Sequence, residues 1–397
     1  MVEFKIGVGT LNLSERCKRY VNQVLDSNRL SYGPFLKKFE NEFARIHDSK
    51  YAVFTNSGTS SLHIAVACLK ERYGWQDGDE VIVPAVTFIA SSNVLIHNGL
   101  VPVFADVEKD YYGIDPSLIE DKITRKTRAI MPVHLFGLPC DMGSIMKIAQ
   151  KYGLKVIEDS CETMFAKYNG RSVGSFGDIS CFSTYVAHLL VTGVGGLTVT
   201  NDPENAVILR SLANHGRDNI YIHIDDDKDK SREELKEIID RRFSFVRMGH
   251  SLRGTEMEGA IGLGQLEEHE EMMRKRRQVA SKLLDGLKDI RQIQLPKIRE
   301  DCDHSFMMFP VVLHNESKER FVNYLESKGI ETRDMLPLVN QPVYKKFFGL
   351  RENMFPIADW INKNGFYIGC HQDISEEEIQ HIIKVFHEFF SFGGQIR

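Results

Sequence analysis

Short apolar segments alternate with amphipathic segments through the first half of this chain, between about residues 50 and 201. Apolar runs of strand length, such as DEVIVPAV and LKVIEDSC, are typical of strands buried on both faces of a sheet, and the stretches between them have helical spacing. Such strands pair in parallel beneath helices. We therefore predict an α/β fold with a mostly parallel central sheet in a large domain, which with the N-terminal segment occupies residues 1–265.

The C-terminal third of the chain has a second, smaller pattern. A long charged helix is expected after residue 265, and it is followed by strand HSFMMFPVVL, helix KERFVNYLESKG, strand IETRDML and closing helix EEEIQHIIKVFHEFF. We therefore expect residues 266–397 to form a linking helix and a smaller C-terminal α/β domain. Between the two patterns, residues 219–243 are highly charged, and we interpret them as a solvated excursion rather than an acidic binding loop.

The charge and cysteine content exclude several classes of partner. The 397 residues carry a formal net charge of −5 with mixed signs, which provides no basic field for nucleic acid and no polybasic membrane anchor. The chain has no apolar run of about 18 residues and no secretory signal pattern, so we expect a cytoplasmic protein without a membrane partner. The seven cysteines are scattered, and their spacing predicts no metal or iron–sulfur site.

Polar residues follow several of the predicted strands, where ligands bind in parallel sheets. Gly58 and Thr59 lie at a strand-to-helix turn whose N–H groups suit a phosphate, although helix capping alone explains such a turn. Asp159 ends a strand, where a carboxylate can keep a pyridine nitrogen protonated or cap the next helix. Phe88 can cover an aromatic cofactor or belong to the core.

The segment DISCFSTYVAHLLVTGVGGLTVTND carries a family resemblance. It resembles the DegT-type sugar aminotransferase/dehydratase family of type I pyridoxal phosphate (PLP) enzymes, whose signature here runs approximately F-S-F-x-x-x-K-x-x-T-x-G-E-G-G. The cofactor-linking lysine of the family falls on His188, and its glutamate falls on Val194. Further matches, namely NSGTSSLH, PAVTF, HLFGLPCDM, VIEDSCETM and GHSLRGTEMEGAIGLGQLE, extend the resemblance over most of the chain.

The resemblance implies a fold, a cofactor and site residues. The fold is that of the type I PLP-dependent transferases, and the cofactor is pyridoxal 5'-phosphate or pyridoxamine 5'-phosphate (PMP). Asp159 is implied at the pyridine nitrogen, Glu162 on the ring-hydroxyl side and Phe88 on the ring face. The residues implied for the cofactor phosphate are Gly58, Thr59 and Ser183.

The resemblance also implies a homodimer, because the family builds its active sites at a two-fold interface. Ser251 stands where the family usually has an asparagine that reaches the cofactor phosphate of the neighbouring subunit. Arg253 and Arg333 are candidates for binding substrate or glutamate anions, since a guanidinium suits bidentate recognition. Each arginine is equally compatible with a surface or interface ion pair.

The histidine at position 188 distinguishes this chain from most of the family. An imidazole cannot form the covalent link that the lysine makes to PLP, but it can still transfer protons near neutral pH. The family branch with a histidine here resembles the PMP-dependent 3-dehydratases, chiefly those acting on GDP-4-keto-6-deoxymannose. Glu162, where ordinary sugar aminotransferases usually have glutamine, favours that branch.

By this resemblance we expect C3 dehydration of a nucleotide-linked 4-keto-6-deoxy sugar, with L-glutamate as amino donor, in dideoxysugar and surface polysaccharide biosynthesis. His188 would remove a proton from C4′ of the cofactor and assist departure of the C3 hydroxyl. Two alternatives remain open. One is a nucleotide-sugar aminotransferase with His188 as its only proton shuttle, and the other is a non-catalytic, regulatory paralogue that binds PLP.

Overall fold

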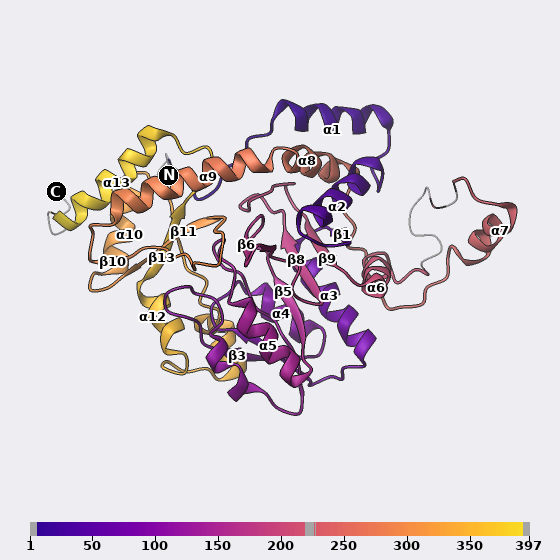
Figure 1. Ribbon diagram of the computed structural model, residues 1–397, viewed down its shortest axis with the longest axis horizontal. Helices are drawn as coiled ribbons and strands as arrows, with labels where there is room; N and C mark the ends of the chain where they lie inside the picture. Colours follow the sequence, from indigo (N-terminus) through magenta and orange to yellow (C-terminus); the bar gives the residue numbers. More distant parts are fainter. Residues whose placement is uncertain (1–5, 219–225, 227, 392–397) are drawn as a thin grey trace.

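The computed structural model describes residues 6–218, 226 and 228–391. Helices and strands follow one another along these residues as labelled in Figure 1. The helices are α1 (Glu15–Ser27), α2 (Pro34–Ile46), α3 (Gly58–Tyr73), α4 (Ala90–His97), α5 (Met142–Tyr152), α6 (Pro203–Ala213), α7 (Arg232–Arg241), α8 (Glu256–Leu266), α9 (His269–Leu287), α10 (Lys318–Ser327), α11 (Pro342–Phe348), α12 (Pro356–Asn364) and α13 (Glu376–Ser391). The strands are β1 (Tyr51–Thr55), β2 (Glu80–Pro84), β3 (Val101–Ala105), β4 (Thr127–Ile130), β5 (Lys155–Asp159), β6 (Lys167–Tyr168), β7 (Arg171–Ser172), β8 (Ile179–Ser183), β9 (Gly196–Thr200), β10 (Ile293–Gln294), β11 (Met308–Leu313), β12 (Thr332–Asp334) and β13 (Gly365–Gly369).

The central sheet has seven described strands in the order β1-β9-β8-β5-β4-β2-β3. The mostly parallel sheet that the sequence predicts is confirmed, with one exception: β9 runs antiparallel to both β1 and β8. The residues that join β8 to β9 form no helix that could carry the chain back for a parallel pairing. The chain therefore returns directly beside β8, and the returning loop carries His188.

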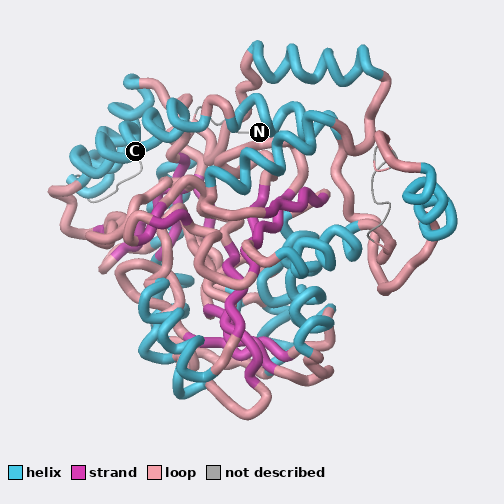
Figure 2. Tube along the Cα trace, turned by 45° about the vertical axis from the view of Figure 1, so that its right-hand side comes forward, coloured by secondary structure: helices cyan, strands magenta, loops and turns pink. Residues whose placement is uncertain are grey.

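Alternating side chains of the central strands enter separate hydrophobic clusters on the two faces of the sheet. In β2, Val81 and Val83 belong to the cluster that includes α3, whereas Ile82 belongs to the cluster formed with α5. Figure 2 shows helices on both sides of the strands. Burial on both faces explains why these strands read as continuous apolar runs in the sequence.

A smaller antiparallel sheet, in the order β10-β11-β13-β12, lies in the C-terminal part of the chain, which we call the C-terminal unit. Its core contains Phe309, Phe321 and Phe386 beside apolar residues of α9 and α13, which lie side by side in Figure 1. Ile6 forms a bridge with Ile330, so the described N-terminal residues reach this unit. The predicted domain boundary at residue 265 lies near the end of α8 and stays a prediction.

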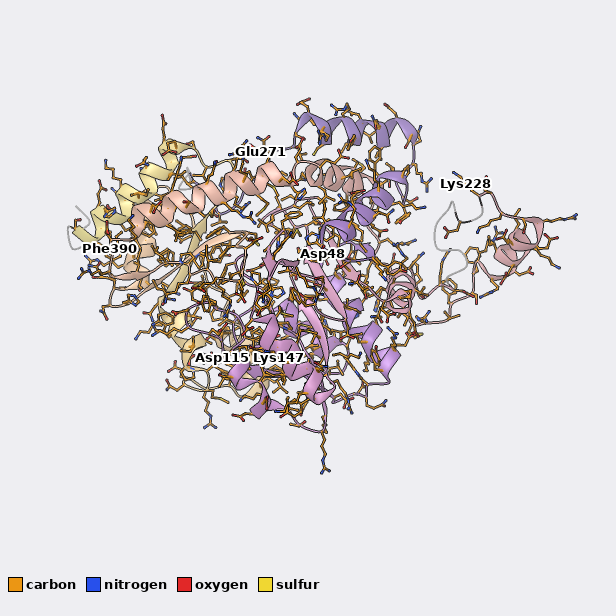
Figure 3. The ribbon with its side chains drawn as sticks, in the orientation of Figure 1. Asp48, Asp115, Lys147, Lys228, Glu271 and Phe390 are labelled. Carbon is orange, nitrogen blue, oxygen red and sulfur yellow. The ribbon has the colours of Figure 1, made fainter. Side chains whose placement is uncertain are left out.

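The charged segment that the sequence predicts as an excursion contains α7, which projects from the body of the molecule in Figure 1. Lys228 lies on the same projection in Figure 3, and residues 219–225 and 227 lie outside the described part. The segment is not only polar, because Ile239 and Phe243 are exposed, and Met248, shortly after it, is 95% exposed. Among the described helices, none is both long and apolar enough to cross a membrane.

A buried carboxylate joins α8 to α2. Glu256, on α8, accepts hydrogen bonds from the backbone N–H groups of Gly33, Phe35 and Leu36, at 2.8, 2.6 and 3.1 Å. These groups lie around the first turn of α2, where helical N–H groups have no acceptor within the helix. The Glu256 side chain therefore provides the hydrogen-bond acceptors for the N–H groups at the start of α2 and fixes this helix against α8.

We expect Glu256→Ala to lower the free energy of unfolding by about 2 to 3 kcal/mol, because it leaves buried backbone donors without acceptors. Urea unfolding followed by circular dichroism measures the change. Glu270→Ala is the matched control, since Glu270 is an exposed glutamate near the start of the next helix, α9; we expect a change within about 0.5 kcal/mol. Equal unfolding curves for both variants would contradict this role of Glu256.

Candidate active site

A cavity of about 410 Å³ lies at the carboxyl ends of β1, β5 and β8. Residues from the C-terminal unit close part of its wall. Most of the residues that the sequence singles out for the cofactor line this cavity. They are Gly58, Thr59, Phe88, Asp159, Glu162, Ser183 and His188, and they are joined by Ser57, Ser91, Cys161, Tyr185, Val194, Met307, Met308 and Tyr367, among others.

One end of the cavity is built from the start of α3. The helix begins at Gly58, and the Ser57 side chain caps it by accepting a hydrogen bond from the Ser60 backbone N–H at 3.0 Å. A Cβ atom on Gly58 would lie 2.7 Å from the Cβ of Ser183, so only glycine allows this approach. The positive helix end, with the Thr59 and Ser183 side chains beside it, suits a phosphate.

Asp159, at the end of β5, is buried with 3% of its surface exposed. Its carboxylate accepts hydrogen bonds from the Ser91 hydroxyl at 2.7 Å and from the Cys161 backbone N–H at 3.1 Å. Burial raises the pKa of Asp159, and these hydrogen bonds oppose the rise. A pyridinium cation fits beside such a group, because the cation would compensate the buried negative charge.

Glu162 is held by an unusual turn of the chain. It accepts a hydrogen bond at 3.1 Å from the backbone N–H of Phe136, whose φ of 57° is rare outside glycine. Burial raises the pKa of Glu162 to about 7, the Phe136 hydrogen bond opposes this, and the charge of Asp159 adds to it. Glu162 can therefore hold or release a proton near neutral pH.

His188 lies in the loop between β8 and β9 and is half-buried. Its Nδ1 lies 2.6 Å from the carbonyl oxygen of Cys161. Because a carbonyl only accepts, Nδ1 carries the hydrogen of the neutral ring and Nε2 keeps the lone pair. Burial lowers the pKa of His188 to about 4, against the effect of this hydrogen bond. Nε2 has no hydrogen-bond partner among the described residues, so the ring is a neutral base with a free nitrogen.

Three of the predicted site residues do not line the cavity. Arg253 donates a hydrogen bond from Nη2 to the Ser251 hydroxyl at 3.1 Å, and this pair lies on the loop before α8. Arg333, on β12, pairs with the carboxylate of Glu331. The structure thus places seven predicted residues together within one chain and leaves these three apart from them.

Several residues of the cavity were not predicted from the sequence. Ser91 binds Asp159 and in turn lies 2.7 Å from the Thr87 hydroxyl, and Cys161 supplies the carbonyl that orients His188. The segments PAVTFIAS and EDSCETM contain them, but nothing in the residue types distinguishes them from core or capping residues. Tyr367 comes from the C-terminal unit, and its place in the cavity depends on how the two sheets pack.

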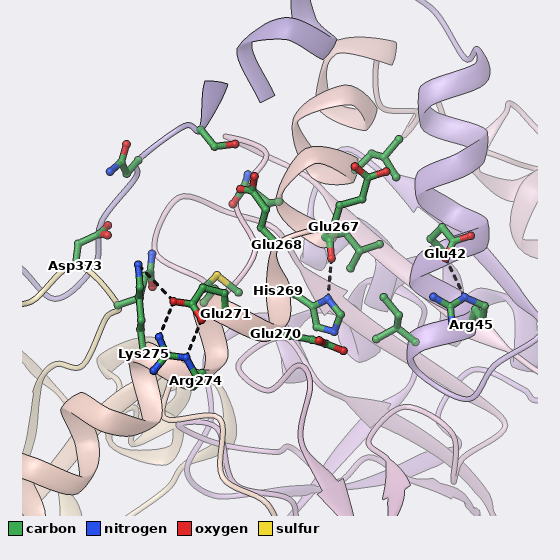
Figure 4. Close-up of a pocket in the computed structure, with 18 of the residues that line it drawn as sticks. Glu42, Arg45, Glu267, Glu268, His269, Glu270, Glu271, Arg274, Lys275 and Asp373 are labelled. Atoms are coloured by element: carbon green, nitrogen blue, oxygen red, sulfur yellow. Dashed lines mark hydrogen bonds and ion pairs between the residues drawn. The ribbon is translucent and has the colours of Figure 1, made fainter. Parts of the chain in front are cut away.

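A larger and more open groove, of about 1140 Å³, lies where α2, the end of α8 and the start of α9 meet. Figure 4 shows that its lining is largely charged. Several of these charges pair with one another, as Arg45 does with Glu42 and Arg274 with Glu271. The described lining of the groove contains the start of α9 and the His269 imidazole but no buried acid, so the smaller cavity is the candidate active site.

The comparisons with known proteins agree with this geometry. The model of the DegT/DnrJ/EryC1/StrS aminotransferase family matches residues 12–387. The chain belongs to this family. It is 35% identical over 383 residues to GDP-perosamine synthase of Escherichia coli O157:H7, covering 96% of this chain and 97% of the relative. It is 32% identical over 379 residues to GDP-4-keto-6-deoxy-D-mannose 3-dehydratase of Escherichia coli O55:H7, covering 92% and 95%.

Solved structures of this family have the same fold. The E. coli GDP-4-keto-6-deoxy-D-mannose 3-dehydratase with bound hydrated PLP superposes with a TM-score of 0.87 at 28% identity and covers 96% of this chain and 99% of its own. Two further structures of such a dehydratase have TM-scores of 0.86; one holds GDP-perosamine and the other a trapped PLP–glutamate adduct. The predicted family, fold class and PLP dependence are confirmed, and the family acts on nucleotide sugars.

The raised pKa of Glu162 predicts a pH-dependent contribution to the stability of the cofactor-free protein. A carboxyl whose pKa rises from 4.5 to about 7 on folding stabilises the folded state below pH 4.5, and that contribution is lost as the pH rises to about 7. We expect the difference in unfolding free energy between wild type and Glu162→Gln to change by up to about 3 kcal/mol between pH 5 and 8. Urea unfolding at several pH values measures it, and a constant difference would refute the raised pKa.

Proposed function

We propose that this protein is a PMP/PLP-dependent 3-dehydratase that removes the C3 hydroxyl of a nucleotide-linked 4-keto-6-deoxy sugar. The proposal rests mainly on the environment of His188. Its Nδ1 is fixed by the Cys161 carbonyl, and Nε2 is free as a base. No lysine lies among the described residues that line the cavity. Such a site suits a cofactor that brings its own amine.

Each polar residue of the cavity has a role in this proposal. Asp159 keeps the pyridine nitrogen protonated, and Glu162 faces the ring-hydroxyl side. His188 takes a proton from C4′ of the cofactor through Nε2 and delivers one to the departing C3 hydroxyl. When bound, the cofactor supplies an amine and a ring that withdraws electrons from the reacting carbons. Phe88 covers the ring face, and the phosphate is held by Gly58, Thr59 and Ser183.

The neutrality of His188 supports its role as a base. With a pKa near 4, nearly every imidazole is unprotonated at pH 7 and can accept a proton at once. The same lowered pKa makes the protonated ring a strong acid, which suits donation of the proton to the leaving hydroxyl. L-glutamate would restore the amine form of the cofactor in a separate half-reaction.

We propose a homodimer as the working form. Ser251 and Arg253 lie apart from the cavity of their own chain, and Arg253 orients the Ser251 hydroxyl. In a two-fold dimer this loop would approach the cofactor phosphate of the neighbouring subunit, where Arg253 adds positive charge. The exposed apolar residues that follow α7 in the chain, including Phe243 and Met248, provide surface that a second subunit can bury.

We also propose that Arg333 binds an anionic group of the substrate outside the cavity.

A second candidate function is amino transfer to the same class of sugar. The 35% identity to a GDP-perosamine synthase favours it. Amino transfer, however, normally uses the family's cofactor-linking lysine, and position 188 holds a histidine in this chain. We therefore favour dehydration, for which the lysine is dispensable.

The first test of the proposal concerns covalent attachment of the cofactor. We expect borohydride treatment of the PLP-loaded protein to leave no stoichiometric phosphopyridoxyl group on any single lysine, because none lines the cavity. Peptide mapping by mass spectrometry detects such an adduct. His188→Lys is the positive control, since the new amine should capture PLP and become labelled. A stoichiometric lysine adduct in wild type would contradict the role assigned to position 188.

The second test concerns the base. His188→Asn keeps a side chain that can hydrogen-bond but cannot exchange protons near neutral pH, so we expect cofactor binding to persist and dehydration to fall at least about 100-fold. Assays with GDP-4-keto-6-deoxymannose measure the rate, and absorbance titration measures cofactor affinity. His269→Asn, outside the cavity, is the control that should retain the wild-type rate. Undiminished dehydration by His188→Asn would exclude His188 as the base.

A further inference from the structure

The hydroxyl of Tyr367, a residue more buried in the cavity wall than the exposed Tyr185, has no use in the proposed mechanism. Tyr367 lies on β13, is half-buried, and lines the cavity from the side of the C-terminal unit. Its ring centroid lies 5.8 Å from that of Phe136, at an interplanar angle of 51°. Its hydroxyl has no hydrogen-bond partner among the described residues. The hydroxyl is not among the buried polar atoms without a partner, so it is open to the cavity, and a ligand bound there can replace water as its acceptor.

Most other polar side chains of the cavity already have partners or assigned tasks; Tyr185 is the exception, and it is largely exposed to solvent. Asp159 is bound by Ser91 and the Cys161 backbone, and Glu162 is bound by Phe136. The elements proposed to hold the phosphate, β8 and the start of α3, belong to the central sheet and its helices, whereas β13 belongs to the smaller sheet. Tyr367 is therefore available to the part of a ligand that extends beyond the cofactor.

The lining of the cavity favours an uncharged, hydroxylated ligand beside Tyr367. The described lining residues include two carboxyl groups and no lysine or arginine. Arg333, across from Tyr367 on the adjacent strand, is already paired with Glu331, so an added carboxylate beside Tyr367 would lie near like charges. Three aromatic side chains, Phe88, Tyr185 and Tyr367, offer apolar faces. Such a mixture of apolar surface and a few directed polar groups suits a sugar ring.

The hydroxyl of Tyr367 acts as a donor in this environment. Burial raises its pKa, and the nearby charge of Glu162 raises it further, while Arg333 on the adjacent strand opposes the rise. The O–H group therefore keeps its hydrogen across the physiological pH range. A sugar hydroxyl or keto oxygen can accept that hydrogen.

We infer that Tyr367 is a specificity-determining residue that donates a hydrogen bond to the hexose of the nucleotide sugar and makes no contact with L-glutamate. This inference rests on the proposed function, since it takes a nucleotide-linked keto sugar as the substrate.

The experiment removes only the hydroxyl, with Tyr367→Phe. Affinity for GDP-4-keto-6-deoxymannose is measured by calorimetry in the PMP-loaded His188→Asn background, so that the sugar is not consumed. We expect about fivefold to tenfold weaker sugar binding, the effect of one lost hydrogen bond. The glutamate response is measured in protein that keeps His188, by following the conversion of PLP to PMP by absorbance. We expect Tyr367→Phe to change the half-saturating glutamate concentration by less than about twofold. Tyr324→Phe, in the same unit but outside the cavity, is the matched control and should change neither value.

Each outcome supports or overturns the inference. Weaker sugar binding with an unchanged glutamate response supports it. Unchanged sugar affinity overturns it, and so does a loss of glutamate response alone or an equal loss in both measurements. If the protein with Tyr367 intact binds neither the sugar nor glutamate, the proposed function fails and the inference fails with it. Binding by the protein that keeps Tyr367 therefore tests the proposed function, and the effect of Tyr367→Phe tests the role assigned to Tyr367.

Discussion

Parallel strands bring their carboxyl ends to one edge of a sheet, and the whole candidate site depends on that constraint. Asp159 ends β5, Ser183 ends β8, and α3 begins three residues after β1 ends. Residues more than 100 positions apart in the chain therefore line a single cavity. The antiparallel return of β9 completes the arrangement, because the loop that leads into it brings His188 to the same edge.

Within that cavity, local hydrogen bonds decide the chemistry that each group can perform. The Cys161 carbonyl selects one tautomer of His188 and leaves Nε2 as a base, while the Cys161 N–H binds Asp159. The backbone of one residue thus fixes both the proposed base and the proposed partner of the pyridine nitrogen. The turn at Phe136 similarly presents its N–H to Glu162. Strained or unusual backbone of this kind is typical of functional sites.

The sequence predicted the parts of this structure that depend on local patterns. Apolar runs such as VIVP gave the strands of the sheet, and the position of His188 in the family signature gave the residue on which the proposal depends. The sequence could not predict the direction of β9, since an apolar run has the same pattern in a parallel and in an antiparallel strand. Ser91 and Tyr367 were missed because their roles arise from packing between distant segments. Dimer formation and the roles of all the site residues, those that line the cavity as well as Ser251, Arg253 and Arg333, stay predictions.

We propose above all that this site removes an oxygen atom from the sugar rather than adding an amino group. Incubating PMP-loaded protein with GDP-4-keto-6-deoxymannose, and then measuring the product mass and free ammonia, tests it most directly. We expect a product lighter than the substrate by one oxygen atom, with ammonia and PLP formed in equal amounts. A product that carries an amino group in place of its keto oxygen, without ammonia release, would contradict it.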